Sequence, residues 1–128
     1  MSDVRGIGVE YDGEILVADA TNGRVDEYRP HGYFVNDIGK GIMTTPRDVV
    51  WTGGGRFAVS DSGTGEVNLY STGRVAPYAW ETPLPALGAP SGLGYDRKNS
   101  WLLIADEEKH DKLLQSLEEF KKSLYPYG

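Results

Sequence analysis

Residues 6–19 read GIGVEYDGEILVAD, and the chain repeats this pattern twice more. The later copies are DVVWTGGGRFAVSD at 48–61 and GLGYDRKNSWLLIAD at 92–106. Each copy has two β-rich runs separated by a turn, and each ends in an aspartate. The three final aspartates lie 42 and 45 residues apart, a period typical of propeller blades with four short strands. The sequence therefore predicts a mostly-β fold, organised as a partial β-propeller.

The first two copies continue in the same way beyond their aspartates. Residues 24–28 and 66–70 alternate apolar and polar side chains, which is the pattern of half-buried strands. A glycine turn follows each of them, and then a short run at 33–35 or 74–76. We therefore expect two complete blades of four strands, whereas the third copy supplies only its first two strands.

The segment 107–124 departs from the repeat. It contains no glycine or proline and is rich in strong helix formers. Its acidic residues come early and its lysines late, as the helix dipole favours. We predict one amphipathic helix there, with these side chains on a narrow apolar stripe: His110, Leu113, Leu117, Phe120 and Leu124.

These patterns divide the chain into three parts. A propeller segment is expected at 1–106, the helix at 107–124 and a tail at 125–128. A proline-rich connector joins the second and third copies, and in it Trp80 is the expected exposed aromatic anchor. Ten strands and one helix are predicted, or about two and a half blades, at about 4–40, 41–85 and 86–106.

The stretch from Gly6 to Val25 resembles the NHL-type repeat of six-bladed β-propellers. The later copies each keep four residues of the motif: Pro46, Val59, Asp61 and Val67 in the second, and Pro90, Gly92, Ile104 and Asp106 in the third. The resemblance implies a propeller fold. Propellers of this and related types include RNA-binding and protein-binding platforms, lactonases and lyases, so the resemblance does not select one activity.

An incomplete third blade leaves unpaired strand edges, which proteins usually cover. Two arrangements would cover them: the helix folds onto its own third blade, or chains assemble through the apolar stripe. We favour assembly into a homo-oligomer, with the stripe and Trp80 at the interface. Simple ring closure by two chains is not supported, because both half blades would supply the first two strands and never the last two.

Acidic residues near the innermost strands are candidates for a metal site. Glu10, Asp12, Asp48 and Asp96 are expected to border the central channel. There the resemblance to propeller lactonases and lyases implies a divalent ion such as calcium, which takes oxygen ligands. We favour the interpretation that these residues are solvated loop charges, so no metal ligand or cofactor is assigned.

The repeated Asp19, Asp61 and Asp106 also have two interpretations. A ring of carboxylates would suit a metal ion. An aspartate at the end of a strand can instead accept hydrogen bonds from backbone groups of the following turn and so fix the hairpin. We favour this structural role.

Composition limits the function classes further. The chain has 128 residues, a net charge of -6 and no cysteine, so disulfide and thiolate chemistry is excluded. The negative charge disfavours nucleic acid as a partner, because such binding depends mainly on Lys and Arg. No run approaches the roughly 18 apolar residues of a membrane span. No secretory signal is visible either, so we expect a soluble, cytoplasmic protein.

Together these observations predict a non-enzymatic protein-interaction or structural module that self-assembles, with no catalytic residue assigned. One alternative is a metal-dependent hydrolase or lyase of the propeller type, which would use the acidic channel residues. A less favoured alternative is an RNA-binding platform.

Overall fold

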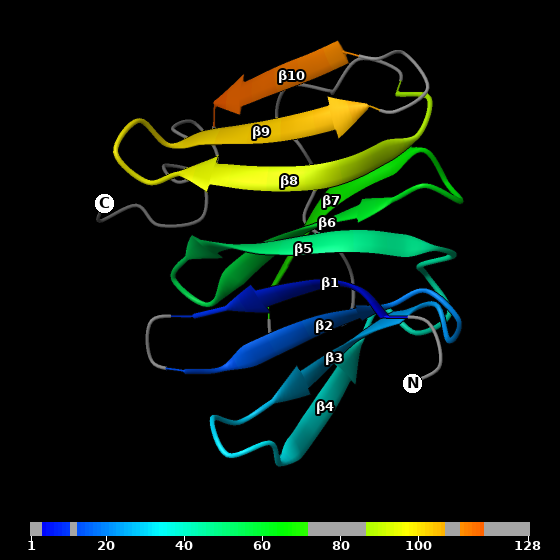
Figure 1. Ribbon diagram of the computed structural model, residues 1–128, viewed down its shortest axis with the longest axis vertical. Coiled ribbons are helices and arrows are strands. Elements are labelled where there is room, and N and C mark those ends of the chain that lie inside the picture. The colour runs from blue at the N-terminus through cyan, green and yellow to red at the C-terminus, as the bar shows by residue number, and fades with distance from the viewer. Residues whose placement is uncertain (1–3, 11–12, 72–86, 107–110, 117–128) are drawn as a thin grey trace.

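The computed structural model describes residues 4–10, 13–71, 87–106 and 111–116, and these form ten strands in three antiparallel sheets (Figure 1). The first sheet contains β1 (Val4–Val9), β2 (Ile15–Asp19), β3 (Arg24–Tyr28) and β4 (Phe34–Ile38). Its strands lie side by side in chain order. The first copy of the repeat thus forms a four-stranded sheet, as a propeller blade requires.

The second and third sheets begin with the second and third copies of the repeat. The second sheet contains β5 (Pro46–Gly53), β6 (Arg56–Asp61) and β7 (Glu66–Ser71), in that order. The third contains β8 (Pro90–Asp96), β9 (Trp101–Asp106) and β10 (Asp111–Ser116), with β9 in the middle. The described residues include no helix that is long and apolar enough to cross a membrane.

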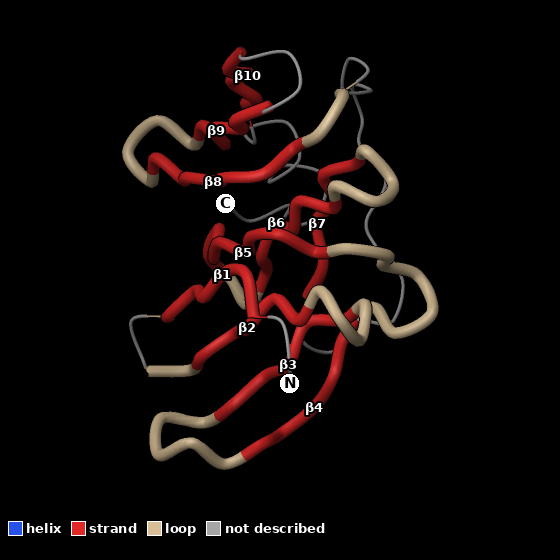
Figure 2. Tube along the Cα trace, turned by 45° about the vertical axis from the view of Figure 1, so that its right-hand side comes forward, coloured by secondary structure: helices blue, strands red, loops and turns tan. Residues whose placement is uncertain are grey.

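The three sheets are stacked through their leading strands. β1 contacts β5, and β5 contacts β8. The other strands of the first and third sheets extend away from this line, so that β4 and β10 lie at opposite ends of the molecule (Figures 1 and 2). Each sheet therefore meets its neighbour face to face.

Every sheet has two faces, because directly paired residues of antiparallel strands project to the same side. We call the face directed at the next sheet in chain order the forward face, and the face directed at the preceding sheet the backward face. Leu16, Ala18 and Val25 belong to the forward face of the first sheet, and they share one buried cluster with Val49 and Trp51 from the second.

This first cluster is closed by aromatic side chains of the second sheet. The rings of Trp51 and Phe57 meet edge to face at 5.6 Å, and the ring of Tyr70 stacks on Phe57 at 5.9 Å. A second cluster joins the forward face of the second sheet, with Ala58 and Leu69, to Leu102 of the third. Most of the stabilising burial is therefore between sheets, where apolar area leaves water.

Two glycines of β1 allow the first and second sheets to approach closely. A Cβ atom on Gly8 would lie 2.9 Å from the carbonyl oxygen of Val49, and one on Gly6 would lie 2.7 Å from the Cα of Asp48. Real Cβ atoms essentially never lie so close to backbone. The glycines of the repeat thus set the distance between adjacent leading strands.

The structure corrects the prediction of a helix at 107–124. Residues 111–116 form β10, which pairs with β9 from Asp111 opposite Asp106 to Ser116 opposite Trp101. Helix propensity is a local preference of a few tenths of a kcal/mol per residue, whereas pairing satisfies the backbone groups along an otherwise open edge of β9. The rest of the predicted helix and the tail lie outside the described residues.

Nine of the ten predicted strands correspond to β1 to β9 of the described residues. The fourth strand of the first copy was expected at 33–35 and is β4, Phe34–Ile38. The fourth strand of the second copy, expected at 74–76, lies outside the described residues, as does the connector with Trp80. The tenth described strand is β10, which the sequence did not predict.

We predict that Gly8→Ala destabilises the fold, because the new methyl group would meet the carbonyl of Val49. The expected loss is about 1–3 kcal/mol in the free energy of unfolding, as for other overpacked sites. Urea unfolding in dilute solution measures it. The matched control is Gly94→Ala at the equivalent position of β8, where the described residues place only the Cβ of Leu103 near the new Cβ, at 3.9 Å. Equal losses in the two variants would contradict the role given to Gly8.

Candidate functional site

The stack of sheets has two terminal faces on which no further described sheet packs. One is the backward face of the first sheet, and the other is the forward face of the third. We call them the first outer face and the second outer face. Several of the large apolar side chains that the structure leaves exposed lie on them, so these two faces are the main candidates for binding.

The first outer face carries a row of apolar side chains across all four strands of its sheet. The register pairs Val9 with Ile15, Ile15 with Tyr28, and Tyr28 with Phe34. The rings of Tyr28 and Phe34 meet edge to face at 5.8 Å. Val9 is 63% exposed and Phe34 is 54% exposed. Ile7, on the same side of β1, is 60% exposed. The neighbouring row on this face differs, because Val17 is 6% exposed and Asp26, paired with it, is 1% exposed. The open apolar part of the face is therefore the row from Val9 to Phe34, with Ile7 beside it.

The second outer face is defined by alternation along β9. Leu102 and Ile104 are buried against the second sheet, whereas Trp101 and Leu103 are 37% and 38% exposed. Leu103 is paired with Gly94 of β8, so the exposed leucine lies beside a stretch of leading strand that has no side chain. This face combines exposed apolar groups with an open strip of backbone.

The sequence interpretation overlooked Ile7, Val9 and Leu103. Each belongs to a β-rich run that predicts core, because an apolar residue in a strand is usually buried. A signal was nevertheless present in the repeat: of the three copies, only the second lies between two others along the chain. The predicted interface residues Trp80, His110, Leu117, Phe120 and Leu124 lie outside the described residues, and Leu113 lies in β10, paired with Ile104.

An open pocket of about 320 Å³ lies where the three leading strands begin. Its lining comes from all three sheets: Arg5, Arg47, Asp48, Ser91 and Gly92. It corresponds to part of the channel border expected from the sequence. The pocket is polar, and its carboxylate comes from a residue that the sequence analysis had singled out as a weak metal candidate.

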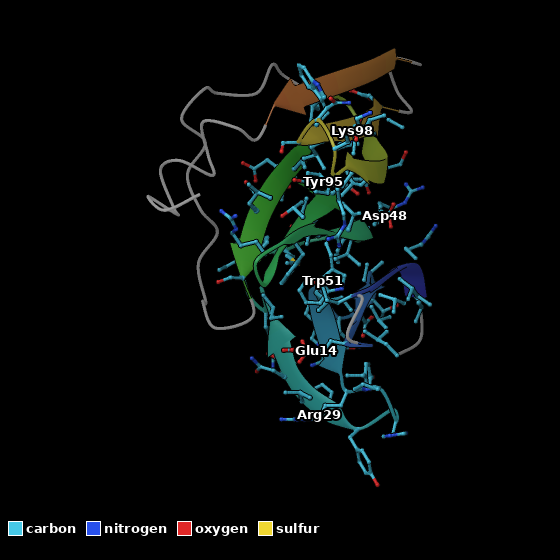
Figure 3. All side chains as sticks on the ribbon, turned by 90° about the vertical axis from the view of Figure 1, so that its left-hand side faces the viewer. Glu14, Arg29, Asp48, Trp51, Tyr95 and Lys98 are labelled. Atoms are coloured by element: carbon cyan, nitrogen blue, oxygen red, sulfur yellow. The ribbon has the colours of Figure 1, made fainter. Side chains whose placement is uncertain are left out.

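Asp48, labelled in Figure 3, takes part in hydrogen bonds that connect the second and third sheets. Its Oδ2 accepts a hydrogen bond from the backbone N–H of Leu93 at 2.8 Å, and its own N–H donates to the Oγ of Ser60 at 3.1 Å. The hydroxyl of Ser60 donates in turn to the carbonyl oxygen of Ser91. The carboxylate therefore connects two leading strands.

The remaining acidic candidates do not gather around this pocket. Glu10 is buried, and its Oε1 lies 3.3 Å from Nη2 of Arg97, just beyond β8. Asp96 is bound within its own turn, where it accepts hydrogen bonds from Lys98 and Asn99. These bonds, led by the one from the Asn99 side chain, lower the pKa of Asp96. Asp12 lies outside the described residues.

The described ranges contain no group of three or more histidine or carboxylate side chains that could hold a metal ion. Asp48 and Glu10 each have a protein partner, and Asp96 is occupied by its turn. The described acidic candidates thus stand apart, each in a different set of contacts.

The repeated aspartates at the ends of the second strands all accept backbone hydrogen bonds. Asp19 accepts them from the backbone and side-chain nitrogens of Asn22, at 3.1 and 2.8 Å. Burial alone would raise the pKa of Asp19, but these bonds hold it below its ordinary value. Its carboxylate therefore caps the turn that leads into β3.

Asp61 and Asp106 also bind the loop that enters the leading strand of their own sheet. Asp61 accepts hydrogen bonds from the N–H groups of Thr44 and Thr45, at 2.7 and 2.9 Å, besides those of the following turn. Asp106 accepts them from Gly88 and Ala89, at 2.8 and 3.0 Å. Each carboxylate fixes the start of the leading strand next to the end of the second strand.

Two further carboxyl groups are buried within the first sheet. Burial raises the pKa of Glu27 to about 7, and the neighbouring carboxyl of Glu14 adds to the shift, while Arg29 opposes it (Figure 3). Burial also raises the pKa of Asp26, whose Oδ1 lies 2.8 Å from Nε of Arg24. Glu27 pairs with Leu16 and so belongs to the forward face, whereas Asp26 pairs with Val17 and belongs to the first outer face. Both are almost fully buried, so they bear on stability.

Comparison with family models finds no match. No curated protein matches the chain in sequence. Solved structures do match, and 162 chains are similar to it. One of them comes from the crystal structure of a nidogen/laminin complex, with a TM-score of 0.68 and 13% identity.

The similarity to that structure covers 87% of this chain and 47% of the matched one. At such low identity it shows the fold alone. The matched fold is a β-propeller, so the chain is a mostly-β protein similar in fold to part of a β-propeller. It spans about half of the matched chain.

We predict that Asp61→Ala destabilises the protein by about 3 kcal/mol or more, because four backbone N–H groups lose a charged acceptor. Chemical denaturation measures the free energy of unfolding. Asp96→Ala is the matched control, since it removes an aspartate that binds only its own exposed turn. A loss for Asp61→Ala no larger than that of the control would contradict the assignment.

The raised pKa of Glu27 predicts a pH dependence of stability. Between its ordinary value of 4.5 and about 7, the unfolded chain has released the proton that the folded chain still holds. Stability contributed by this site is therefore full at low pH and falls as pH rises to about 7. Thermal unfolding at about pH 5 and about pH 8 should show this loss in the wild type and a smaller one in Glu27→Gln. Parallel behaviour of both proteins would rule it out.

Proposed function

We propose that this chain is a non-enzymatic protein-interaction module, built as an NHL-like propeller segment, that associates with further copies of itself. The proposal rests on the exposed apolar side chains of the two outer faces. Val9 and Phe34 on one, and Trp101 and Leu103 on the other, present apolar area that a partner would remove from water. Aromatic and aliphatic side chains of this kind anchor protein interfaces.

Three further points support a protein partner. The described residues bring together no set of groups for metal chemistry. The net charge of -6 disfavours nucleic acid. The matched fold was solved in a complex of nidogen and laminin, so a propeller of this shape is compatible with binding a protein. The repeat motif from Gly6 to Val25 supports the NHL-like assignment.

Light scattering across a dilution series tests the proposal. We expect the intact chain to have a mass above the 14.0 kDa of one copy and to approach that value on dilution. Val9→Asp should shift the series toward a single copy, because a carboxylate would have to be buried at the interface. Tyr33→Asp is the matched control: Tyr33 is 71% exposed but lies in the turn before β4. A single-copy mass at every concentration would contradict self-association.

A further inference from the structure

We infer that two copies of this chain join head to tail, with the first outer face of each copy packed on the second outer face of the other. This inference rests on the self-association proposed above and specifies which surfaces meet. It follows from the equivalence of the repeats. Inside the chain, a backward face packs on a forward face twice. The first outer face is a backward face and the second outer face is a forward face, and no described sheet packs on either.

The backward faces of all three sheets carry an equivalent row of side chains. In the second sheet the register pairs Trp51, Phe57 and Tyr70, and these are buried against the first sheet. In the third sheet it pairs Tyr95 with Leu102, which pack against the second. In the first sheet the same positions are Val9, Ile15 and Tyr28. This row has the composition of an interface, but no sheet of the described residues packs on it.

The forward faces are equivalent in the same sense. Gly8 pairs with Leu16 in the first sheet, and Leu16 is buried beneath the second. Val50 pairs with Ala58 in the second sheet, and Ala58 is buried beneath the third. Gly94 pairs with Leu103 in the third sheet, and Leu103 is partly exposed. The forward face of the third sheet thus resembles that of the first, with glycine beside leucine.

The glycines show that the second outer face has room for another leading strand. At Gly8 a Cβ would strike the carbonyl of Val49, which belongs to the strand packed there. At Gly94 and Gly92 a Cβ would meet, among the described residues, side chains of β9 alone, each at 3.9 Å. On the first sheet, the glycines of β1 form a strip against which β5 packs. The glycines of β8 form the equivalent strip on the third sheet, and no described strand packs on it. β1 of a second copy would therefore lie against β8 as β5 lies against β1.

The number of copies follows from the sheets. Each chain contributes three described sheets, and a solved chain of the same fold is about twice as long, since this chain aligns with 47% of it. Two copies would therefore supply a similar number of sheets. Ring closure by two chains is not supported if the third blade has only its first two strands, but in the structure β10 adds a third strand to that blade. Two equal contacts would then cover both outer faces of both copies.

Mixing two variants tests the pairing of unlike faces. The first variant, Ile7→Asp with Val9→Asp, disables the first outer face and leaves the second intact. The other, Gly94→Arg, disables the second outer face and leaves the first intact. Gly94→Ala is a second, smaller substitution at the same site. Its methyl group would make ordinary contacts within one chain, but it would collide with a docked strand, as a methyl group on Gly8 would collide with Val49. Circular dichroism and thermal unfolding check that each variant folds.

Light scattering should give the mass of two copies for the wild type and of one copy, 14.0 kDa, for each variant alone. An equimolar mixture of the two variants should recover a two-copy species, because one intact pair of unlike faces remains. The mixed pair should dissociate at higher concentration than the wild type, since it has one contact instead of two.

The outcomes separate this inference from the proposed function. A single-copy wild type overturns the self-association on which both rest. A two-copy wild type with an unaffected Gly94→Arg variant overturns the inference alone, because the first outer face would then pair with itself. Two folded variants that stay single when mixed overturn it as well, and so does a wild-type mass that grows beyond two copies with concentration.

Discussion

Face-to-face packing of neighbouring sheets is the constraint on which the rest of the structure depends. An apolar sheet face is stable only when another layer packs on it. Here the leading strands set the spacing: Gly6 and Gly8 let the backbone of β5 approach β1, and Leu16 and Trp51 then reach across the same gap. The core, the pocket and the two outer faces all follow from this one mode of packing.

Much of the fold could be predicted from the sequence because its signals are local. The alternation, turns and final aspartates of the three copies predicted mostly-β structure, and the antiparallel sheets confirm it. The exception at 111–116 depends on a partner outside the segment: the residues there prefer helix individually, but the edge of β9 offers a row of backbone groups to pair with. A pattern within one segment contains no information about that edge.

The candidate site was less accessible to sequence reasoning for a related reason. Val9 and Trp51 occupy the same position in their copies, yet one is exposed and the other buried. The difference comes from the number of neighbouring sheets and not from the residues. For the acidic candidates, the position could be predicted but the partner could not. The sequence placed Asp48 at the border of the leading strands, but only the structure revealed its hydrogen bond from Leu93, 45 residues away.

The final aspartates also bear on how the chain reaches its folded state. Asp61 binds Thr44 and Thr45, and Asp106 binds Gly88 and Ala89, so each carboxylate closes a loop of only 16 to 18 residues within one copy of the repeat. Short loops cost little entropy to close, and contacts of low sequence separation favour rapid folding. Each sheet can thus complete its own boundary while the chain is still being synthesised, before the next copy has emerged.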